Sequence, residues 1–207
     1  MNPIQVAVLS LFHPIDGFPM IKERRNNFSY IPALVLYVLF FASRIASIYI
    51  THFPLADTNP KTANIWIEIG TYLLPIVTWV IVNYAITSIA QGEAQMRELF
   101  TSVAYSLLPY IIVTVPTALL SYFFAETDGG MITGLRSAAM ILLIFYIFIS
   151  TLSMHGYTVG KTIGIVFITL ISMVLMWALI LIMYGLTSNV INFISTILFE
   201  LKMIYIG

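Results

Sequence analysis

The chain has 207 residues, of which 60 % are hydrophobic and 9 % are charged, and its mean hydropathy is +0.97. Because soluble domains carry about 25 % charged residues, this composition indicates an integral membrane protein. Nine basic residues balance nine acidic ones, so no basic field attracts nucleic acid, and the lack of cysteine excludes disulfides, thiolate nucleophiles and cysteine metal sites.

Residues 1–30 are expected to form a segment at the cytoplasmic face of the membrane. Their apolar run, residues 4–12, is too short to span a bilayer, which takes about 20 apolar residues. The run also contains Gln5 and Ser10. These features predict a loose amphipathic helix in the membrane interface.

Residues 31–185 are expected to form a five-helix transmembrane domain, because five apolar runs can each cross a hydrocarbon core of about 30 Å. The runs are residues 31–50, 65–89, 103–124, 131–153 and 162–185. The third run has no charge and contains Pro109 and Pro116, which fall on nearly one helical face. Each proline frees a carbonyl that lipid cannot satisfy. Two interpretations stay open: an ordinary kinked span, or the central helix of a bundle whose proline face a neighbouring helix covers.

Two pairs of opposite charges are candidates for ion pairs. Arg44 and Glu68 lie near the outer ends of consecutive antiparallel spans, so they can pair at similar depth. The alternative is that each extends separately to the headgroups. Glu93 and Arg97, in the link before the third span, stand in the order that favours a helical ion pair.

The distribution of basic residues orients the chain, because lysine and arginine collect in short cytoplasmic loops. Five lie on the side of the N-terminus: Lys22, Arg24, Arg25, Arg97 and Lys161. The opposite side has two: Lys61 and Lys202. The sequence therefore predicts a multi-pass protein of the cell membrane with a cytoplasmic N-terminus and an external C-terminus.

Residues 186–207 are expected to form an amphipathic helix on the outer face. Its apolar face consists of Val190, Ile191, Phe193, Ile194, Ile197, Leu198 and Leu201. Either lipid or a partner subunit can receive this face, and Phe193, Ile194, Ile197 and Leu201 are the candidate partner contacts. The predicted fold class is thus all-α, with five transmembrane helices and short interfacial helices at both ends.

Three glycines recur every four residues: Gly156, Gly160 and Gly164. This spacing of small residues favours close packing of membrane helices. Residues 156–162 resemble a phosphate-binding loop, but three residues separate the first glycine from Gly-Lys, where the nucleotide motif has four. No nucleotide cofactor is expected.

No catalytic or metal site is expected either. His13, His52 and His155 lie in separate loops, without carboxylates at metal-ligand spacing. The sequence contains no HExxH or GxSxG string. The second to fifth spans have no acidic residue near their centres, which argues against proton-coupled transport.

Three short segments together resemble one known family. HPIDGF precedes the first span, AYSLLPY opens the third, and HGYTVGKT precedes the fifth. With five spans, this arrangement resembles the Yip family of Rab-interacting membrane proteins, in its bacterial form. Tyr105 and Pro109 are the best matches, followed by Lys161, and the first two join the candidate partner contacts.

The resemblance implies a role beside other proteins. Eukaryotic members contact Rab GTPases in Golgi and ER membranes, but this sequence lacks their long N-terminal cytoplasmic region. Some bacterial relatives accompany ABC importers for oligosaccharides, so the resemblance implies permease subunits as a partner, besides membrane lipid.

The hypothesis is therefore a non-enzymatic accessory or scaffold subunit that packs against a partner membrane complex, with the permeases of an oligosaccharide ABC importer as the candidate. The alternative is a small transporter or channel, in which breaks at Pro75, Pro109 and Pro116 line a polar path.

Single cysteines introduced at Asn27 and Gly207 should react with a membrane-impermeant thiol reagent from opposite sides, because an odd number of spans separates them. The parent chain has no cysteine, so only the introduced thiol is labelled. Labelling of both positions from the same side would contradict the five-span topology.

Overall fold

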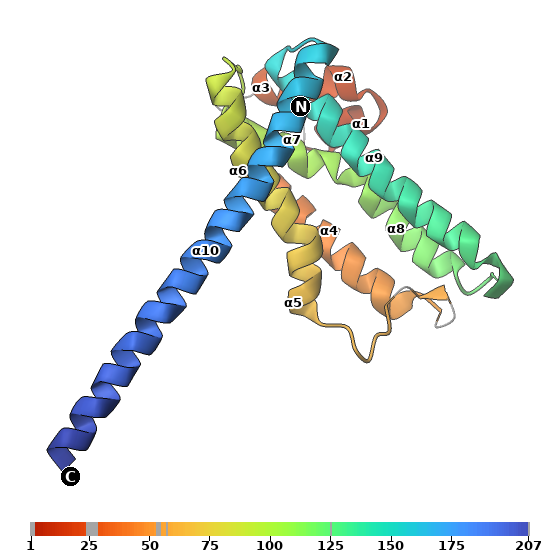
Figure 1. Cartoon of the computed structure of the whole chain (residues 1–207). Helices are drawn as coiled ribbons and strands as arrows, with labels where there is room; N and C mark the ends of the chain where they lie inside the picture. Colours follow the sequence, from red (N-terminus) through yellow and green to blue (C-terminus); the bar gives the residue numbers. More distant parts are fainter. Residues whose placement is uncertain (1–2, 24–28, 53–54, 57, 125, 207) are drawn as a thin grey trace.

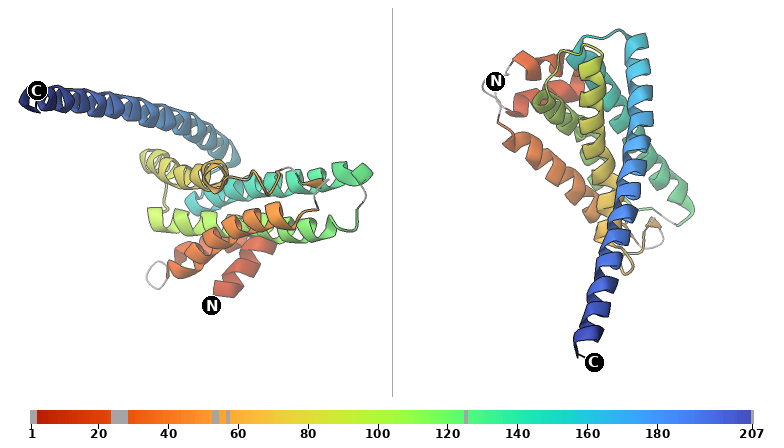
Figure 2. Two further views of the ribbon diagram at one scale, coloured as in Figure 1. Left: turned by 90° about the horizontal axis from the view of Figure 1, so that it is seen from below. Right: turned by 60° about the vertical axis from the view of Figure 1, so that its left-hand side comes forward.

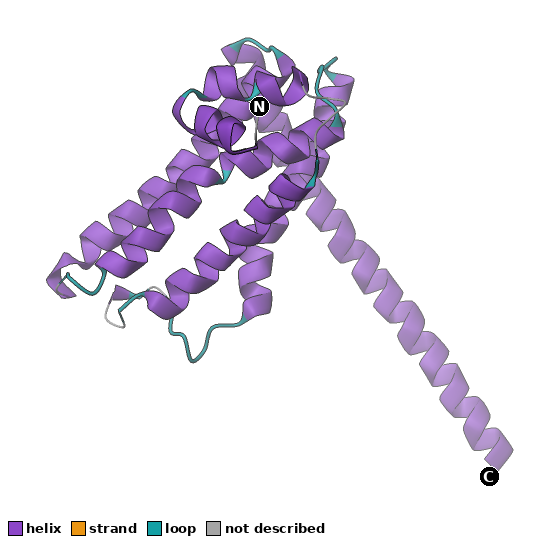
Figure 3. Ribbon diagram, turned by 180° about the vertical axis from the view of Figure 1, so that it is seen from behind, coloured by secondary structure: helices purple, strands orange, loops and turns teal. Residues whose placement is uncertain are grey.

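The computed structural model describes most of the chain as helices and connecting turns, with no strand among the described residues (Figure 3). The described ranges are 3–23, 29–52, 55–56, 58–124 and 126–206. Asn27 and Gly207, the positions chosen for labelling, lie outside them. In chain order the elements are α1 (Pro3–Phe12), α2 (Pro14–Gly17), α3 (Pro19–Glu23), α4 (Ile31–Ile50), α5 (Ile65–Glu68), the π-helical turn η2 (Ile69–Leu73), α6 (Leu74–Ile89), α7 (Met96–Ser106), α8 (Leu108–Leu120), the 3-10 turn η3 (Glu126–Asp128), α9 (Gly129–His155) and α10 (Val159–Ile206).

Five helical stretches of the described chain are long and apolar enough to cross a membrane. They are Ile31–Ile50, Ile65–Ile89, Met96–Leu120, Gly129–His155 and Val159–Phe199. This confirms the predicted all-α membrane fold, and the first two stretches have the predicted bounds. The third begins earlier than predicted because Glu98 stabilises the helix start. Its carboxylate accepts a hydrogen bond from the Gln95 amide at 2.8 Å, as in a capping box.

The third span consists of two helices, α7 and α8, and it is the most buried of the five. Pro109 has no amide hydrogen to donate to the Tyr105 carbonyl, so the helical ladder is interrupted there. Just before it, the Leu107 amide donates a hydrogen bond to the Ala104 carbonyl at 3.2 Å, three residues back rather than the four of an α-helix. Pro109 is buried and Pro116 is exposed, so the proline face is covered only near α7. The burial of the span favours its interpretation as the central helix.

The three short N-terminal helices pack on one end of the bundle, against α7, α8 and α9 (Figure 1). Val6 and Phe18 are fully buried. Helices α1 and α2 approach each other closely, because a Cβ atom on Gly17 would lie 2.6 Å from the Ser10 amide nitrogen. The N-terminal segment is thus packed on the bundle, which differs from the loose interfacial helix expected from the sequence.

The second span is irregular in its first half. Asn64 begins it as the cap of α5, with its Oδ1 accepting a hydrogen bond from the Trp66 amide at 2.9 Å. The π-helical turn η2 follows, and Pro75 stands in the first turn of α6. Both a π-helical turn and a proline are recognised causes of helix kinks.

The C-terminal helix α10 is continuous over 48 residues and is about 72 Å long at about 1.5 Å per residue. The boundary expected at Gly185, between a fifth span and a separate helix of residues 186–207, is absent. A single glycine costs a helix only about 1 kcal/mol, and no proline follows it. The segment beyond Gly185 is therefore the distal part of α10 rather than a short helix of its own.

Among the side chains described in α10, those that pack on the bundle lie in its first part. Thr162, Ile165 and Thr169 are buried, and Thr169 Oγ1 accepts a hydrogen bond from Asn83 Nδ2 of α6 at 3.3 Å. Met173 still packs against the core. Beyond it α10 diverges from the other helices (Figures 1 and 2).

Replacing Gly17 with alanine should lower the free energy of unfolding by about 1–3 kcal/mol, because the added methyl group overpacks a site closed by backbone atoms. Thermal or denaturant unfolding in detergent measures the change. Gly134→Ala is the matched control, since no atom lies within 4 Å of its added Cβ. That variant should be as stable as the parent or slightly more so. Equal stability of the two variants would contradict close packing of α1 on α2.

Candidate functional site

The sequence segments that carry the family resemblance meet at one end of the bundle. HPIDGF forms α2 and its flanks, AYSLLPY forms the break between α7 and α8, and HGYTVGKT forms the turn between α9 and α10. Helices α1 to α3 pack on the same end (Figure 1). From the sequence, this end is predicted to face the cytoplasm.

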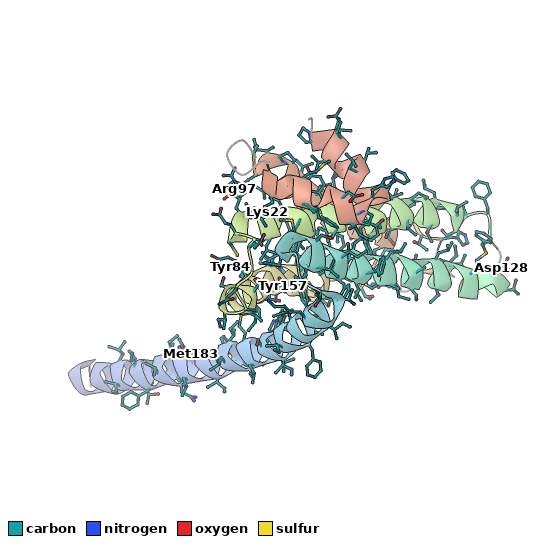
Figure 4. The ribbon with its side chains drawn as sticks, turned by 90° about the horizontal axis from the view of Figure 1, so that it is seen from above. Lys22, Tyr84, Arg97, Asp128, Tyr157 and Met183 are labelled. Carbon is teal, nitrogen blue, oxygen red and sulfur yellow. The ribbon has the colours of Figure 1, made fainter. Side chains whose placement is uncertain are left out.

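Five residues from distant parts of the sequence form a contact network here, which we name the end cluster. They are Lys22, Glu93, His155, Tyr157 and Lys161, of which Figure 4 labels Lys22 and Tyr157. Lys22 forms an ion pair with Glu93. The His155 and Tyr157 rings stack with their centroids 5.1 Å apart. The Lys161 ammonium lies 4.0 Å from the centroid of the Tyr157 ring, which is a cation–π distance.

The link between α6 and α7 is held against this cluster. The Ala90 carbonyl accepts a hydrogen bond from Lys161 Nζ at 3.1 Å, and the Ala94 amide donates one to His155 Nδ1 at 3.4 Å. Gly92 lies so close that a Cβ atom would stand 2.4 Å from His155 Nδ1. The end cluster therefore fastens the α6–α7 link to the α9–α10 turn.

The electrostatics of the end cluster favour a structural role. The hydrogen bond from Lys22 lowers the pKa of the Glu93 carboxyl, so the ion pair persists at neutral pH. Burial, and then the charge on Glu93, raises the pKa of the Tyr157 hydroxyl, which therefore stays neutral. The described residues contain no group of three His, Cys, Asp or Glu that could hold a metal ion. The cluster is suited to holding segments together.

A family model matches most of the chain. The model of the Yip1 domain matches residues 8–182, a range that includes the whole end cluster. The chain belongs to the Yip family. No curated protein and no solved structure shows a significant match to it. Because the Yip1 domain ends at residue 182, the last part of α10 lies outside the matched region.

The two residues of the Yip segment AYSLLPY that were expected to contact a partner lie inside the bundle. Tyr105 is only 1 % exposed, and its hydroxyl lies 3.5 Å from the Pro3 carbonyl of α1. Pro109 is buried in the first turn of α8. Their burial means that they shape the broken third span and do not present a surface to a partner in this structure.

The helical ion pair expected between Glu93 and Arg97 is wrong. The capping box starts α7 after Glu93, so the two residues do not share a helix, and Glu93 pairs with Lys22 of α3. The Arg97 guanidinium instead stacks 4.5 Å from the centroid of the Tyr30 ring. No local pattern indicates Lys22 as the partner, because it is 71 residues away from Glu93.

At the other end of the bundle, the structure brings Arg44 and Glu68 together. Arg44 Nε donates to Glu68 Oε2 at 2.8 Å, and the two side chains are only 10 % and 9 % exposed. The guanidinium also lies 4.5 Å from the centroid of the Tyr72 ring. These contacts fix the start of the second span against α4, and neither charge extends separately to the headgroups.

The three glycines with four-residue spacing do not pack helices within the described chain. Gly156 ends α9 with a φ of +61°, the left-handed conformation of a glycine that terminates a helix. No atom lies within 4 Å of a Cβ atom added to Gly160 or Gly164. Thr162 and Ile165, between them, are buried instead. The expected packing role is therefore wrong within the single chain.

The candidate partner contacts of the C-terminal segment lie on the exposed distal part of α10. Phe193, Ile194 and Ile197 are 66 %, 50 % and 40 % exposed. Leu201 belongs to the same helix, and its side chain lies outside the described part of the structure. These positions form a surface that the described residues leave uncovered.

The three prolines of the transporter alternative do not line the same cavity. Pro75 borders a cavity of about 380 Å³ between α4, α6, α9 and α10. Its walls are mainly large apolar side chains, among them Phe40, Trp79, Leu143 and Phe148. Pro109 and Pro116 are not among its lining residues. The cavity that Pro75 borders is therefore apolar, and the three prolines do not share it.

Arg44→Met should lower the free energy of unfolding by about 3–5 kcal/mol, because it leaves the buried Glu68 carboxylate without its partner. Adding Glu68→Leu should restore most of that loss, since the pair is then replaced by apolar side chains. Unfolding in detergent completes the double-mutant cycle. Lys61→Met, at an exposed position, is the control and should change stability by less than about 0.5 kcal/mol. A double variant no more stable than Arg44→Met would contradict the coupling.

Proposed function

We propose that this Yip-family chain is a non-catalytic accessory subunit that packs laterally against a partner membrane complex through the distal part of α10. The observation that carries the proposal is the apolar surface that leaves the bundle. From Val174 to Phe199, most of the large apolar side chains are 40–75 % exposed. A surface of this length requires an apolar cover.

Helix α10 is too long for the hydrocarbon core of the bilayer to bury its whole apolar surface. Its apolar stretch has 41 residues, whereas about 20 cross the hydrocarbon core. Apolar surface that extends beyond the core is unfavourable by about 25 cal/mol per Å² in water. A partner with apolar helices can cover the remainder.

The contacts inside the bundle support a scaffold more than a catalyst. The end cluster consists of an ion pair, a ring stack and a cation–π contact, without a nucleophile beside a general base. In this proposal it faces the cytoplasm of a cell-membrane protein, while distal α10 reaches the partner. The permease subunits of an ABC importer for oligosaccharides are the partner that the bacterial Yip resemblance suggests.

Changing Phe193 and Ile197 together to asparagine should abolish stoichiometric co-purification with a co-expressed permease pair in mild detergent, because both side chains belong to the exposed apolar face. The matched control is Asn189→Ala with Asn192→Ala, on the polar side of the same helix. It should retain the partner. Unfolding of the isolated double variant checks that the bundle stays intact.

Full retention of the permeases by the Phe193 and Ile197 variant would contradict docking through α10. Solute flux by the chain alone in liposomes would favour the transporter alternative instead.

A further inference from the structure

A cleft of about 640 Å³ opens at the predicted cytoplasmic end, between the start of α4, the end of α6 and the start of α7. Its walls are Tyr30, Leu34, Tyr84, Gln95, Met96, Arg97 and Phe100. Figure 4 labels Arg97 and Tyr84 at this edge of the bundle. Arg97 belongs to the first turn of the third span, so the predicted topology puts the cleft at the depth of lipid headgroups.

An apolar groove of about 400 Å³ continues from this cleft between α4 and α6. The two hollows share Leu34 and Phe100. The other walls of the groove are Tyr37, Val38, Phe41, Ala42, Leu73 and Val77. From Leu34 to Ala42 the helix rises about 12 Å, and this part of α4 belongs to the first span. The groove therefore runs from the headgroup level into the hydrocarbon.

Arg97 is a cation without a carboxylate partner among the described residues. Its guanidinium stacks on Tyr30, and its Nε atom is buried without a hydrogen-bond acceptor. The adjacent acid, Glu98, directs its carboxylate to the Gln95 amide. Arg97 is half-buried and lines the cleft, and a cation without a carboxylate partner at such a position is stabilised by an anion that brings oxygen atoms.

We propose that the cleft and the groove together bind one anionic phospholipid, with its phosphate on Arg97 and an acyl chain between α4 and α6. Phosphate oxygens satisfy guanidinium donors in strong, charge-assisted hydrogen bonds. Basic pockets between membrane helices on the cytoplasmic side bind acidic headgroups. A lipid supplies the anion and the apolar chain in one molecule, in the order in which the structure arranges the two hollows. This site is separate from distal α10 and does not depend on the proposed partner.

The test uses the purified full chain in nanodiscs that contain equal amounts of phosphatidylglycerol and phosphatidylcholine. Native mass spectrometry after release counts the lipids that stay bound. The parent chain should retain phosphatidylglycerol in preference to phosphatidylcholine. Arg97→Gln should reduce that preference about fivefold, the effect of one basic residue near a headgroup, and Arg97→Lys should keep part of it. Lys61→Gln, which removes an exposed charge elsewhere, is the matched control and should leave the preference unchanged.

The groove is tested by filling it. Ala42→Trp should reduce retention of both lipids, whereas Ile112→Trp, on an exposed position of α8 outside the groove, should not.

Equal retention of the two lipids by the parent chain would overturn the proposal, as would an unchanged preference in Arg97→Gln. Normal retention by Ala42→Trp would overturn the acyl site. Loss of a bound protein rather than of lipid in Arg97→Gln would assign the cleft to a protein partner instead.

Discussion

Within a bilayer every backbone polar group must find its partner inside the protein, and this constraint governs where the helices of the chain break. Pro109 interrupts the third span at a point where the surrounding helices bury it. The break separates α7, which contacts the N-terminal helices, from α8, which contacts both α4 and α9. The break at Pro109 therefore lies where neighbouring helices surround it, in the most buried of the five spans.

The sequence could predict features that depend on local composition or on the order of the spans. The apolar runs of the sequence predict the five membrane-crossing stretches, because the length and hydropathy of a run are local properties. The contact of Arg44 with Glu68 was foreseeable, because antiparallel neighbours bring the end of one span to the start of the next. The end cluster was not foreseeable as a unit. Its ion pair joins Lys22 to Glu93 across 71 residues, and no periodicity encodes such a contact.

Periodicity indicates which residues share a helical face but does not indicate where a helix ends or what covers the face. The pattern around Phe193 and Ile197 is the same in a separate helix and in a continuation of the fifth span, and Gly185 is too weak a breaker to separate them. The glycine spacing is equally ambiguous. Gly156 ends α9, whereas Gly160 and Gly164 face open space, although all three fit one packing pattern.

The two ends of α10 have different surroundings, and this difference bears on the proposed docking of its distal part. Near its start, Lys161 bonds to the α6–α7 link and Thr169 to Asn83 of α6. These contacts fix the direction of the helix before it leaves the bundle. Because the distal part continues the same helix, it is already ordered along its length. A surface ordered before binding loses less conformational entropy when a partner covers it, so in the proposed docking the contacts at the start of α10 would favour binding through the distal part, which they do not touch.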